Sequence, residues 1–364
     1  MRVTTTRLRL LLTATIASAC LGAPASAPAS AQDAATPGKG RLDRVRVHGV
    51  SLEGNLSGDS PDRDVTIYLP PGYDADANRR YPVIYMLHGY TDSDERWMGL
   101  RQSWINLSAV LDSTFAEDGA RGMILVMPNA YTRFQGSMYS NSITTGYWED
   151  FVTRDLVAWV DGNYRTIATR DGRGLAGHSM GGYGAVRIGM KHPEVYAAVY
   201  ALSPCCMAPR SAAPEALAAM RRAEEITTME QFAAAPFGTR ALIASAAAWA
   251  PNPAKPPFFL DLPTENGEPR HDVIARMAAN APLAMVDQYI PNLKRLRGFA
   301  IDSGDEDRGI APAVRELHEI LDARGVDHLF AIYPGDHLSG VAGRIRTVML
   351  PFFAHHLAAD PARD

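Results

Sequence analysis

Apolar positions in the first part of the chain alternate with polar ones. The alternation runs through residues 45–47 and again through residues 65–69, and Gly54, Gly58 and Pro61 lie between the runs. A period of two is typical of strands that bury only one face. These two runs therefore predict a leading β-hairpin.

Short continuous apolar runs then replace the alternation. Such runs, with helix-like stretches between them, occupy residues 83–87, 100–115 (helix), 123–127, 148–164 (helix), 175–176, 181–191 (helix) and 195–202. The pattern returns near the C-terminus, at residues 298–301, 314–323 (helix), 328–333 and 340–356 (helix). Buried strands that alternate with helices are typical of a mostly parallel sheet covered on both faces, so we predict an α/β fold.

Between these two parts lies a stretch without strand patterning. Residues 204–293 are rich in Ala, with helical segments expected at residues 214–223 and 242–250 and several prolines afterwards. We interpret residues 204–293 as a helical insertion within one catalytic domain, residues 43–364. Long connections of this kind usually lie above the sheet edge where ligands bind.

Three aromatic residues of the insertion are candidates for a substrate-binding wall: Trp249, Phe258 and Phe259. For each one taken singly, a packing contact inside the insertion is an equally good explanation. The pattern alone leaves the two alternatives open.

The first residues resemble an export signal. Three Arg precede a short apolar run from Leu10 to about Leu21, and Ala29-Ser30-Ala31 supplies a small-x-small cleavage site. We predict a signal peptide at residues 1–31, followed by a linker at residues 32–42 and by secreted or periplasmic localisation. The apolar run is too short to span a membrane, and a disordered Ala/Pro-rich tail would not need it.

Composition narrows the class of protein. The chain has 364 residues, 46% of them hydrophobic and 21% charged, with a formal net charge of −4. It can bury a large core, and it has no basic cluster of the kind that binds nucleic acid. Nothing in the pattern fixes the oligomeric state.

Three cysteines are present. The residues before Cys20 lack the large apolar side chain expected at a lipidation site, so we expect Cys20 to leave with the signal. Cys205 and Cys206 would then remain, too few for a disulfide framework. We expect two buried thiols, and whether they are bonded stays open.

The candidate nucleophile is Ser179. It lies at the centre of a G-x-S-x-G sequence between an expected strand and an expected helix. Glycines on both sides let the chain turn sharply and lift the hydroxyl above the sheet edge. The alternative is a plain strand-to-helix turn of small residues.

A second motif supports the catalytic interpretation. His88-Gly89 follows the apolar run 83–87 directly. Acyl transfer needs two backbone N–H groups aimed at the developing oxyanion, one after the nucleophile and one from the loop after an earlier strand. Met180 and Tyr90 are the natural pair, unless His88-Gly89 is only a turn at the end of a strand.

The remaining partners should follow in the order acid, then histidine. Of the ten histidines, only His337 lies in a loop directly after a late strand, where an imidazole can reach over the sheet to activate the serine. The acid should come from the loop after Asp302, where spacing alone does not separate Asp305, Glu306 and Asp307. We take Asp307 as the acid, and a cation site is the alternative use of this acidic cluster.

No cofactor or metal motif is apparent in the sequence. The G-x-G-x-x-G of residues 172–177 lies in the strand that leads to Ser179, not in a loop that opens a helix, so we assign no nucleotide site. The sequence contains no H-E-x-x-H, C-x-x-C or calcium-loop motif. The predicted chemistry requires no metal.

These motifs together resemble the esterase D-like branch of the α/β hydrolases, which includes feruloyl and acetylxylan esterases, S-formylglutathione hydrolases, enterochelin esterases and mycolyltransferases. The resemblance rests on Tyr-Leu-Pro-Pro-Gly-Tyr at residues 68–73, Tyr-Pro-Val-Ile-Tyr-Met-Leu-His-Gly at 81–89, Asp-Leu at 155–156, Asn-Tyr-Arg-Thr at 163–166, residues 176–185, Asp-Ser-Gly at 302–304 and His337.

The resemblance implies an α/β-hydrolase fold and hydrolysis of a carboxylic ester through an acyl-enzyme, without a cofactor. It also implies that Asp302 and Asp307 open and close a D-x-G-x-x-D sequence whose last residue is the catalytic acid. Predicted export favours a polysaccharide-linked feruloyl or acetyl ester, a siderophore ester or another small-molecule ester over a cytoplasmic thiol conjugate. The alternatives are an acyltransferase of the mycolyltransferase type and a non-catalytic binding protein on a hydrolase scaffold.

Overall fold

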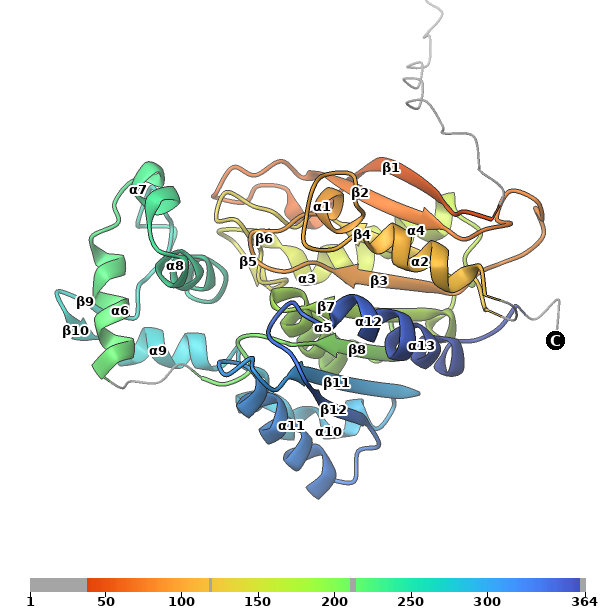
Figure 1. Cartoon of the computed structure of the whole chain (residues 1–364). Coiled ribbons are helices and arrows are strands. Elements are labelled where there is room, and N and C mark those ends of the chain that lie inside the picture. Colours follow the sequence, from red (N-terminus) through yellow and green to blue (C-terminus); the bar gives the residue numbers. More distant parts are fainter. Residues whose placement is uncertain (1–37, 118–119, 210–213, 361–364) are drawn as a thin grey trace, which may run out of the picture. The chain divides into compact units, whose positions relative to one another are not determined.

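A computed structural model describes residues 38–117, 120–209 and 214–360 (Figure 1). The predicted signal peptide 1–31, with Cys20, lies outside the described residues, as does most of the predicted linker. The first strand begins at Arg41, just inside the expected end of the linker. No helix in the described part of the chain is long and apolar enough to cross a bilayer.

An eight-stranded sheet forms the centre of the fold. In spatial order its strands are β1 (Arg41–His48), β2 (Asp62–Leu69), β4 (Ile124–Pro128), β3 (Val83–Leu87), β7 (Arg173–His178), β8 (Ala198–Leu202), β11 (Gly298–Gly304) and β12 (Leu329–Tyr333). The six strands from β4 to β12 are parallel, and β1 and β2 form the predicted antiparallel hairpin. This is the α/β-hydrolase architecture expected from the sequence.

The register of the parallel strands brings several loops to one edge. Leu87 pairs with Gly177, and Leu202 pairs with both His178 and Asp302. Gly304 pairs with Tyr333 one strand farther on. The loops that follow β3, β7, β8, β11 and β12 therefore all begin at the same carboxyl edge of the sheet.

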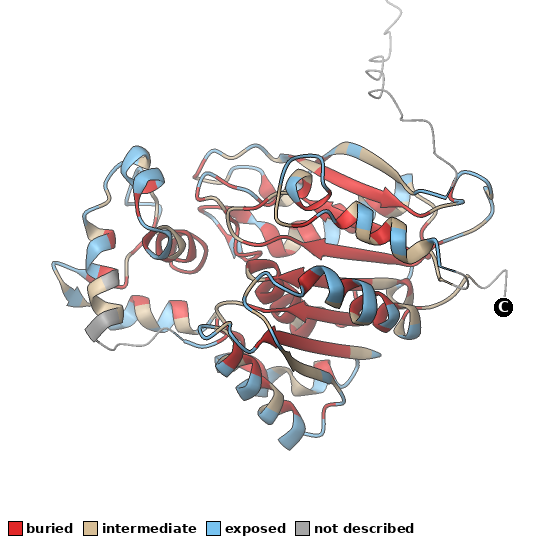
Figure 2. Cartoon of the chain, in the orientation of Figure 1, coloured by how far each residue is buried: buried red, intermediate tan, exposed pale blue. Residues whose placement is uncertain are grey.

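Helices cover both faces of the sheet, so its central strands are buried throughout (Figures 1 and 2). One face packs on α2 (Leu107–Phe115) and on the C-terminal helical run formed by α12 (Val341–Arg344), a π-helical turn (Ile345–Met349) and α13 (Leu350–His356). The other packs on the helical run Trp148–Asn163 (α3, a π-helical turn Phe151–Asp155, and α4), α5 (Met180–Lys191), α10 (Pro282–Leu293) and α11 (Ala311–Ala323).

Residues between β8 and α10 form the mostly helical segment expected there. It contains α6 (Pro214–Glu224), α7 (Met229–Ala234), α8 (Phe237–Trp249), a short hairpin of β9 (Thr264–Glu265) and β10 (Glu268–Pro269), and α9 (His271–Ala278). A second short hairpin, β5 (Asn141–Ser142) with β6 (Gly146–Tyr147), precedes α3. Helix α10 packs on α5 and α11, so the last helix of the predicted insertion covers the sheet.

One predicted helix is shorter than the pattern suggested. Residues 100–115 were expected to be helical, but α2 begins only at Leu107, after the short helix α1 (Asp94–Trp97). Asn106 caps α2 by accepting from the Ala109 N–H at 3.1 Å. Trp104 packs edge-on against Trp97, with ring centroids 5.1 Å apart, so its apolar character serves the loop.

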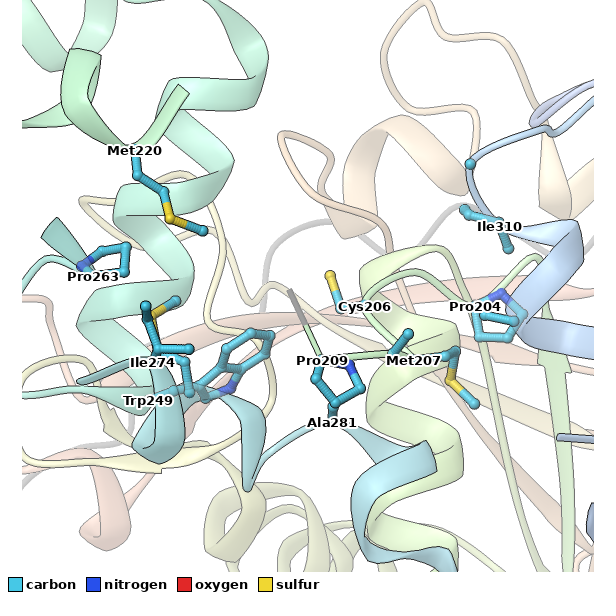
Figure 3. Close-up of a pocket in the computed structure, with 14 residues that line it drawn as sticks. Pro204, Cys206, Met207, Pro209, Met220, Trp249, Pro263, Ile274, Ala281 and Ile310 are labelled. Atoms are coloured by element: carbon cyan, nitrogen blue, oxygen red, sulfur yellow. The ribbon is translucent and has the colours of Figure 1, made fainter. Parts of the chain in front are cut away.

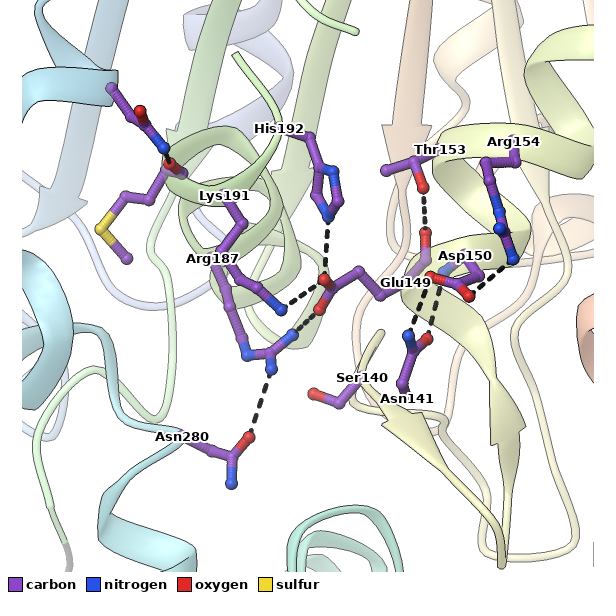
Figure 4. Close-up of polar contacts among 12 residues, drawn as sticks. Ser140, Asn141, Glu149, Asp150, Thr153, Arg154, Arg187, Lys191, His192 and Asn280 are labelled. Carbon is purple, nitrogen blue, oxygen red and sulfur yellow. Dashed lines mark hydrogen bonds and ion pairs between the residues drawn. The ribbon is translucent and has the colours of Figure 1, made fainter. Parts of the chain in front are cut away.

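A buried glutamate ties α3 to α5 (Figure 4). The Glu149 carboxylate is paired with Arg187 and Lys191 and lies 2.9 Å from His192 Nε2. Burial acts to raise the pKa of Glu149, but His192, Arg187 and Lys191 outweigh it and lower the pKa to about 2. Arg187 also donates to the Asn280 side chain at 3.3 Å, which links the pair to the residues just before α10.

Candidate active site

Ser179 occupies a strained turn between β7 and α5. Its φ of 57° lies in the left-handed region that a residue with a side chain seldom adopts. Its N–H donates to the Leu202 carbonyl at 3.0 Å, and its own carbonyl accepts from Tyr183 N–H at 2.9 Å and Cys205 N–H at 3.1 Å. The backbone on both sides thus fixes where the Ser179 hydroxyl stands.

The two flanking glycines are required by packing. A Cβ on Gly177 would collide with the Gly181 backbone, and a Cβ on Gly181 would collide with the Leu87 carbonyl. Strand β7, helix α5 and the end of β3 therefore approach more closely than any side chain allows. The G-x-S-x-G sequence has this direct structural cause.

The loop after β3 lies against the serine turn. A Cβ on Gly89 would stand 3.5 Å from the Ser179 Cβ, so the Gly89-Tyr90 peptide runs directly beside the candidate nucleophile. Gly136, from the loop after β4, packs where only a hydrogen fits between the Tyr90 ring and the Met180 sulfur. The side chains of Tyr90 and Met180, whose N–H groups are the predicted oxyanion donors, thus both pack against Gly136.

His88 fixes the orientation of that peptide. Its Nε2 accepts from the Ala130 N–H at 2.8 Å, so the proton of the neutral ring is on Nδ1, which donates to the Gly89 carbonyl at 2.8 Å. Burial lowers the pKa of His88, which keeps the ring neutral. In a planar trans peptide the N–H points opposite the carbonyl, so holding Gly89 O sets the direction of the Tyr90 N–H.

His337 and Asp307 meet above the carboxyl edge of the sheet. His337 Nδ1 lies 2.6 Å from Asp307 Oδ2, and the Asp307 side chain is only 10% exposed. A carboxylate only accepts hydrogen bonds, so the Nδ1 proton points at Asp307 and Nε2 is left as the acceptor. In the described part of the chain no hydrogen bond joins the Ser179 hydroxyl to His337. Such catalytic bonds often tighten only when substrate binds.

His178 links the histidine loop to the nucleophile turn, a role that sequence reasoning missed. Its Nε2–H donates to the His337 carbonyl at 2.8 Å, and the two imidazole rings lie 4.7 Å apart between centroids. Burial, followed by the charge of His337, lowers the pKa of His178 to about 3, so it stays neutral. His178 directly precedes Ser179, so this bond ties the two loops together.

The other acidic residues of the 302–307 cluster have different partners. Asp302 is fully buried and accepts from Tyr200 Oη at 2.6 Å and Arg344 Nε at 2.9 Å. Asp305 is exposed and accepts from the Gly335 N–H at 3.0 Å. Glu306 is exposed as well. In the described residues, no three His, Cys, Asp or Glu side chains group as metal ligands.

An apolar cavity of about 210 Å³ opens beside this site (Figure 3). Pro204 and Cys206 line it next to the turn that holds Ser179, and Ile310, whose N–H donates to the Asp307 carbonyl, lines it near the candidate acid. Among the described residues, no charged side chain lines the cavity. Across from these residues stand side chains of the inserted helices and hairpin, namely Met220, Trp249, Pro263, Ile274 and Met277.

The three predicted wall residues are not brought together. Trp249 lines the cavity beside Ser179, packs on the Tyr183 ring and donates from Nε1 to Ser140 Oγ at 3.1 Å. Phe258 instead lines a second cavity of about 330 Å³, within the insertion. Phe259 lines neither cavity, and its backbone carbonyl accepts from Thr144 Oγ1 at 2.6 Å.

Comparison with known proteins settles the family. The model of the Esterase family matches residues 60–340, which hold every candidate catalytic residue. The chain belongs to the Esterase family.

Two named relatives in sequence agree with this family. Over 133 residues the chain is 34% identical to Esterase Rv1288 of Mycobacterium tuberculosis, covering 35% of this chain and 26% of the relative. Over 147 residues it is 32% identical to the S-formylglutathione hydrolase of Paracoccus denitrificans, covering 38% of this chain and 50% of the relative. These matches span only a quarter to a half of the relatives' lengths.

Solved structures share the fold. A ferulic acid esterase superposes with a TM-score of 0.61 at 21% sequence identity, covering 88% of this chain and 99% of that one. At this identity the likeness shows the fold alone, which is that of the α/β hydrolases.

Proposed function

We propose that this chain hydrolyses carboxylic esters through an acyl-enzyme. Ser179 is the nucleophile, His337 the general base, Asp307 the acid that holds the imidazole tautomer, and the Tyr90 and Met180 N–H groups form the oxyanion hole. The observation that carries the proposal is the His337–Asp307 hydrogen bond of 2.6 Å at the edge where Ser179 stands in a left-handed turn. Membership of the Esterase family supports it.

In the proposed reaction, His337 Nε2 takes the Ser179 proton as the oxygen attacks the ester carbonyl. The resulting oxyanion accepts from the two N–H groups, and His337 returns the proton to the departing alcohol. Water then repeats the sequence on the acyl-enzyme. Neutral His88 keeps one oxyanion donor aimed, and neutral His178 keeps the His337 loop against the nucleophile.

The proposed substrate is an ester of an apolar acyl group. The cavity beside Ser179 is lined by apolar side chains, and its one indole N–H is already bonded to Ser140. About 210 Å³ is below the ~300–1,000 Å³ of drug-sized ligand sites, which favours one small acyl group. Since the described lining offers no available polar side chain for a phenol, an aliphatic acyl group is favoured over a feruloyl group.

We also propose that the protein acts outside the cytoplasm after residues 1–31 are removed. The basic start, the short apolar run and the small-x-small site support this. The N-terminal sequence of the chain recovered from a periplasmic or culture fraction tests it. A start near Gln32 is expected, and a start at Met1 would contradict export by cleavage.

The direct test of the proposed reaction is hydrolysis of p-nitrophenyl acetate, butyrate and hexanoate by the wild type and Ser179→Ala. Loss of the nucleophile should remove on the order of 10⁶-fold of kcat for all three esters. Far-UV circular dichroism controls for folding. Turnover retained in pure, folded Ser179→Ala protein would overturn the mechanism.

A further inference from the structure

Cys205 and Cys206 are adjacent in sequence and their sulfurs touch. The two Sγ atoms stand 2.8 Å apart, and both residues are half-buried in the turn that follows β8. The proposed ester hydrolysis uses neither sulfur. They are the cysteines of the described part of the chain, so no other described thiol competes for either.

The backbone around the pair is held in place on several sides. Ser203, with φ 40°, donates its N–H to the Asp302 carbonyl at 2.8 Å, and Cys205 donates to the Ser179 carbonyl at 3.1 Å. Cys206 has a φ of 61°, and the next carbonyl, that of Met207, accepts from the Leu283 N–H at 2.9 Å. The backbone of this turn is therefore held against the Ser179 turn, β11 and α10, which keeps the two cysteines side by side.

The pair also borders the proposed acyl cavity. Cys206 lines it together with Pro204, Met207 and Trp249 (Figure 3). Cys205 is the preceding residue, and its N–H donates a hydrogen bond to the carbonyl of Ser179, the proposed nucleophile. A change in the bonding of these sulfurs therefore alters the wall of that cavity.

We propose that Cys205 and Cys206 form a redox site, closing to a vicinal disulfide with a low-molecular-mass disulfide as oxidant. One cysteine thiolate attacks the small disulfide, forms a mixed disulfide and releases one thiolate. The neighbouring thiolate then attacks the protein sulfur of that mixed disulfide and displaces the second small thiolate. Two cysteine protons are given up, the protein pair is oxidised by two electrons, and one small disulfide becomes two thiols.

Proximity drives the second step. Because the two sulfurs are already in contact, the second attack is intramolecular. A mixed disulfide at either position should therefore be short-lived. The same contact makes ring closure the expected end product, even though bonded neighbours demand an uncommon backbone.

The site is tested on the intact purified protein with oxidised glutathione as the oxidant. After treatment, the chain is denatured, alkylated with iodoacetamide and digested. The mass of the peptide that contains both cysteines is then measured by mass spectrometry. The expected peptide has lost two hydrogens and carries neither alkyl group nor glutathione. Recovery of a doubly alkylated peptide, or of a persistent glutathione adduct, would overturn the proposal.

Single variants provide the matched control. In Cys205→Ser, and likewise in Cys206→Ser, the neighbouring thiolate that carries out the second step is missing. The remaining cysteine should therefore keep its glutathione. A phosphine reductant should restore two alkylation sites in the wild type. Wild-type protein that accumulates as much stable glutathione adduct as the variants would refute closure.

A kinetic measurement tests the link to the cavity and rests on the proposed esterase function. Closure should change the ratio of hexanoate to acetate kcat/KM by about threefold, less than a whole methylene is worth in an apolar pocket. The double variant Cys205→Ser/Cys206→Ser, which has no thiol at either position, should lose this response to oxidant relative to its own untreated form. A closed ring with an unchanged ratio would refute the effect on the cavity, and an inactive wild type would refute the proposed function instead.

Discussion

The carboxyl edge of the sheet and the helical segment above it are built by different means. At the edge, backbone hydrogen bonds and strand register position Ser179, Asp307 and His337, and even the supporting histidines act on carbonyl groups. The inserted helices instead present apolar side chains such as Met220 and Met277 to the cavity. The difference suggests that the edge fixes the chemistry and the insertion selects the acyl group.

After loss of the nucleophile itself, the largest expected effect lies at the acid. Asp307→Asn should lower kcat by on the order of 10⁴-fold for every ester, because an amide no longer enforces the His337 tautomer. Steady-state kinetics with p-nitrophenyl acetate and hexanoate at neutral pH would measure it. Asp305→Asn and Glu306→Gln, on the same loop, are the matched controls and should stay within about threefold. If kcat collapsed in either control while Asp307→Asn stayed active, the catalytic acid would be that control residue and not Asp307.

The next effect concerns the aim of the oxyanion donor. His88→Ala removes the bond to the Gly89 carbonyl and should cost on the order of 10²-fold in kcat, as loss of one oxyanion donor does. The loss should be equal for acetate and hexanoate, since the acyl cavity is untouched. Active-site titration corrects for misfolded protein. Normal turnover per titrated site would show that His88 only stabilises the loop.

A substitution in the inserted helices tests whether the apolar cavity holds the acyl chain of the ester. Met277→Trp fills the cavity from α9 and should lower kcat/KM for hexanoate about tenfold relative to acetate. Ala275→Trp is the matched control, because Ala275 lies on the exposed side of the same helix. An equal loss for both esters in Met277→Trp would mean that this cavity does not hold the acyl chain.

Substitution of Glu149 should have the smallest effect on catalysis, because Glu149 takes no part in the proposed reaction. Glu149→Gln should leave kcat of the folded enzyme within about twofold but lower the free energy of unfolding by about 3 kcal/mol at pH 7, because Arg187 loses its buried partner. The pKa of Glu149 lies at about 2 in the folded protein, below its ordinary value of 4.5. Its stabilisation is thus complete above pH 4.5 and is lost as the pH falls towards 2.

Urea unfolding of both proteins at pH 7 and pH 3 checks this sign. The difference between wild type and Glu149→Gln should shrink at the lower pH. An equal difference at the two values would mean that the carboxylate charge contributes nothing to the fold.

The same contrast explains what the sequence could predict. The parallel strands, the order of Ser179, Asp307 and His337, and the glycines around the serine follow from short patterns, and the structure places them at one edge. Chain order excludes His88 and His178 as the general base, because both precede the acid, yet each contacts another loop, 42 and 159 residues away. Short-range patterns carry no signal for such contacts.

The insertion was the least predictable region for a related reason. Its Ala-rich helices give little indication of which side faces the sheet, so the sequence did not single out Met220, Ile274 or Met277. Phe258 was expected beside Trp249 but lines a separate cavity. Side chains that act by shape alone are recognised only once their neighbours are known.

Covalent labelling by a fluorophosphonate tests directly whether Ser179 is the nucleophile. The intact protein is incubated with the probe, weighed by mass spectrometry and mapped by peptide sequencing, beside folded Ser179→Ala. The account predicts a single adduct per chain, located on Ser179 and absent from the variant. An adduct on another residue, or equal labelling of Ser179→Ala, would contradict it.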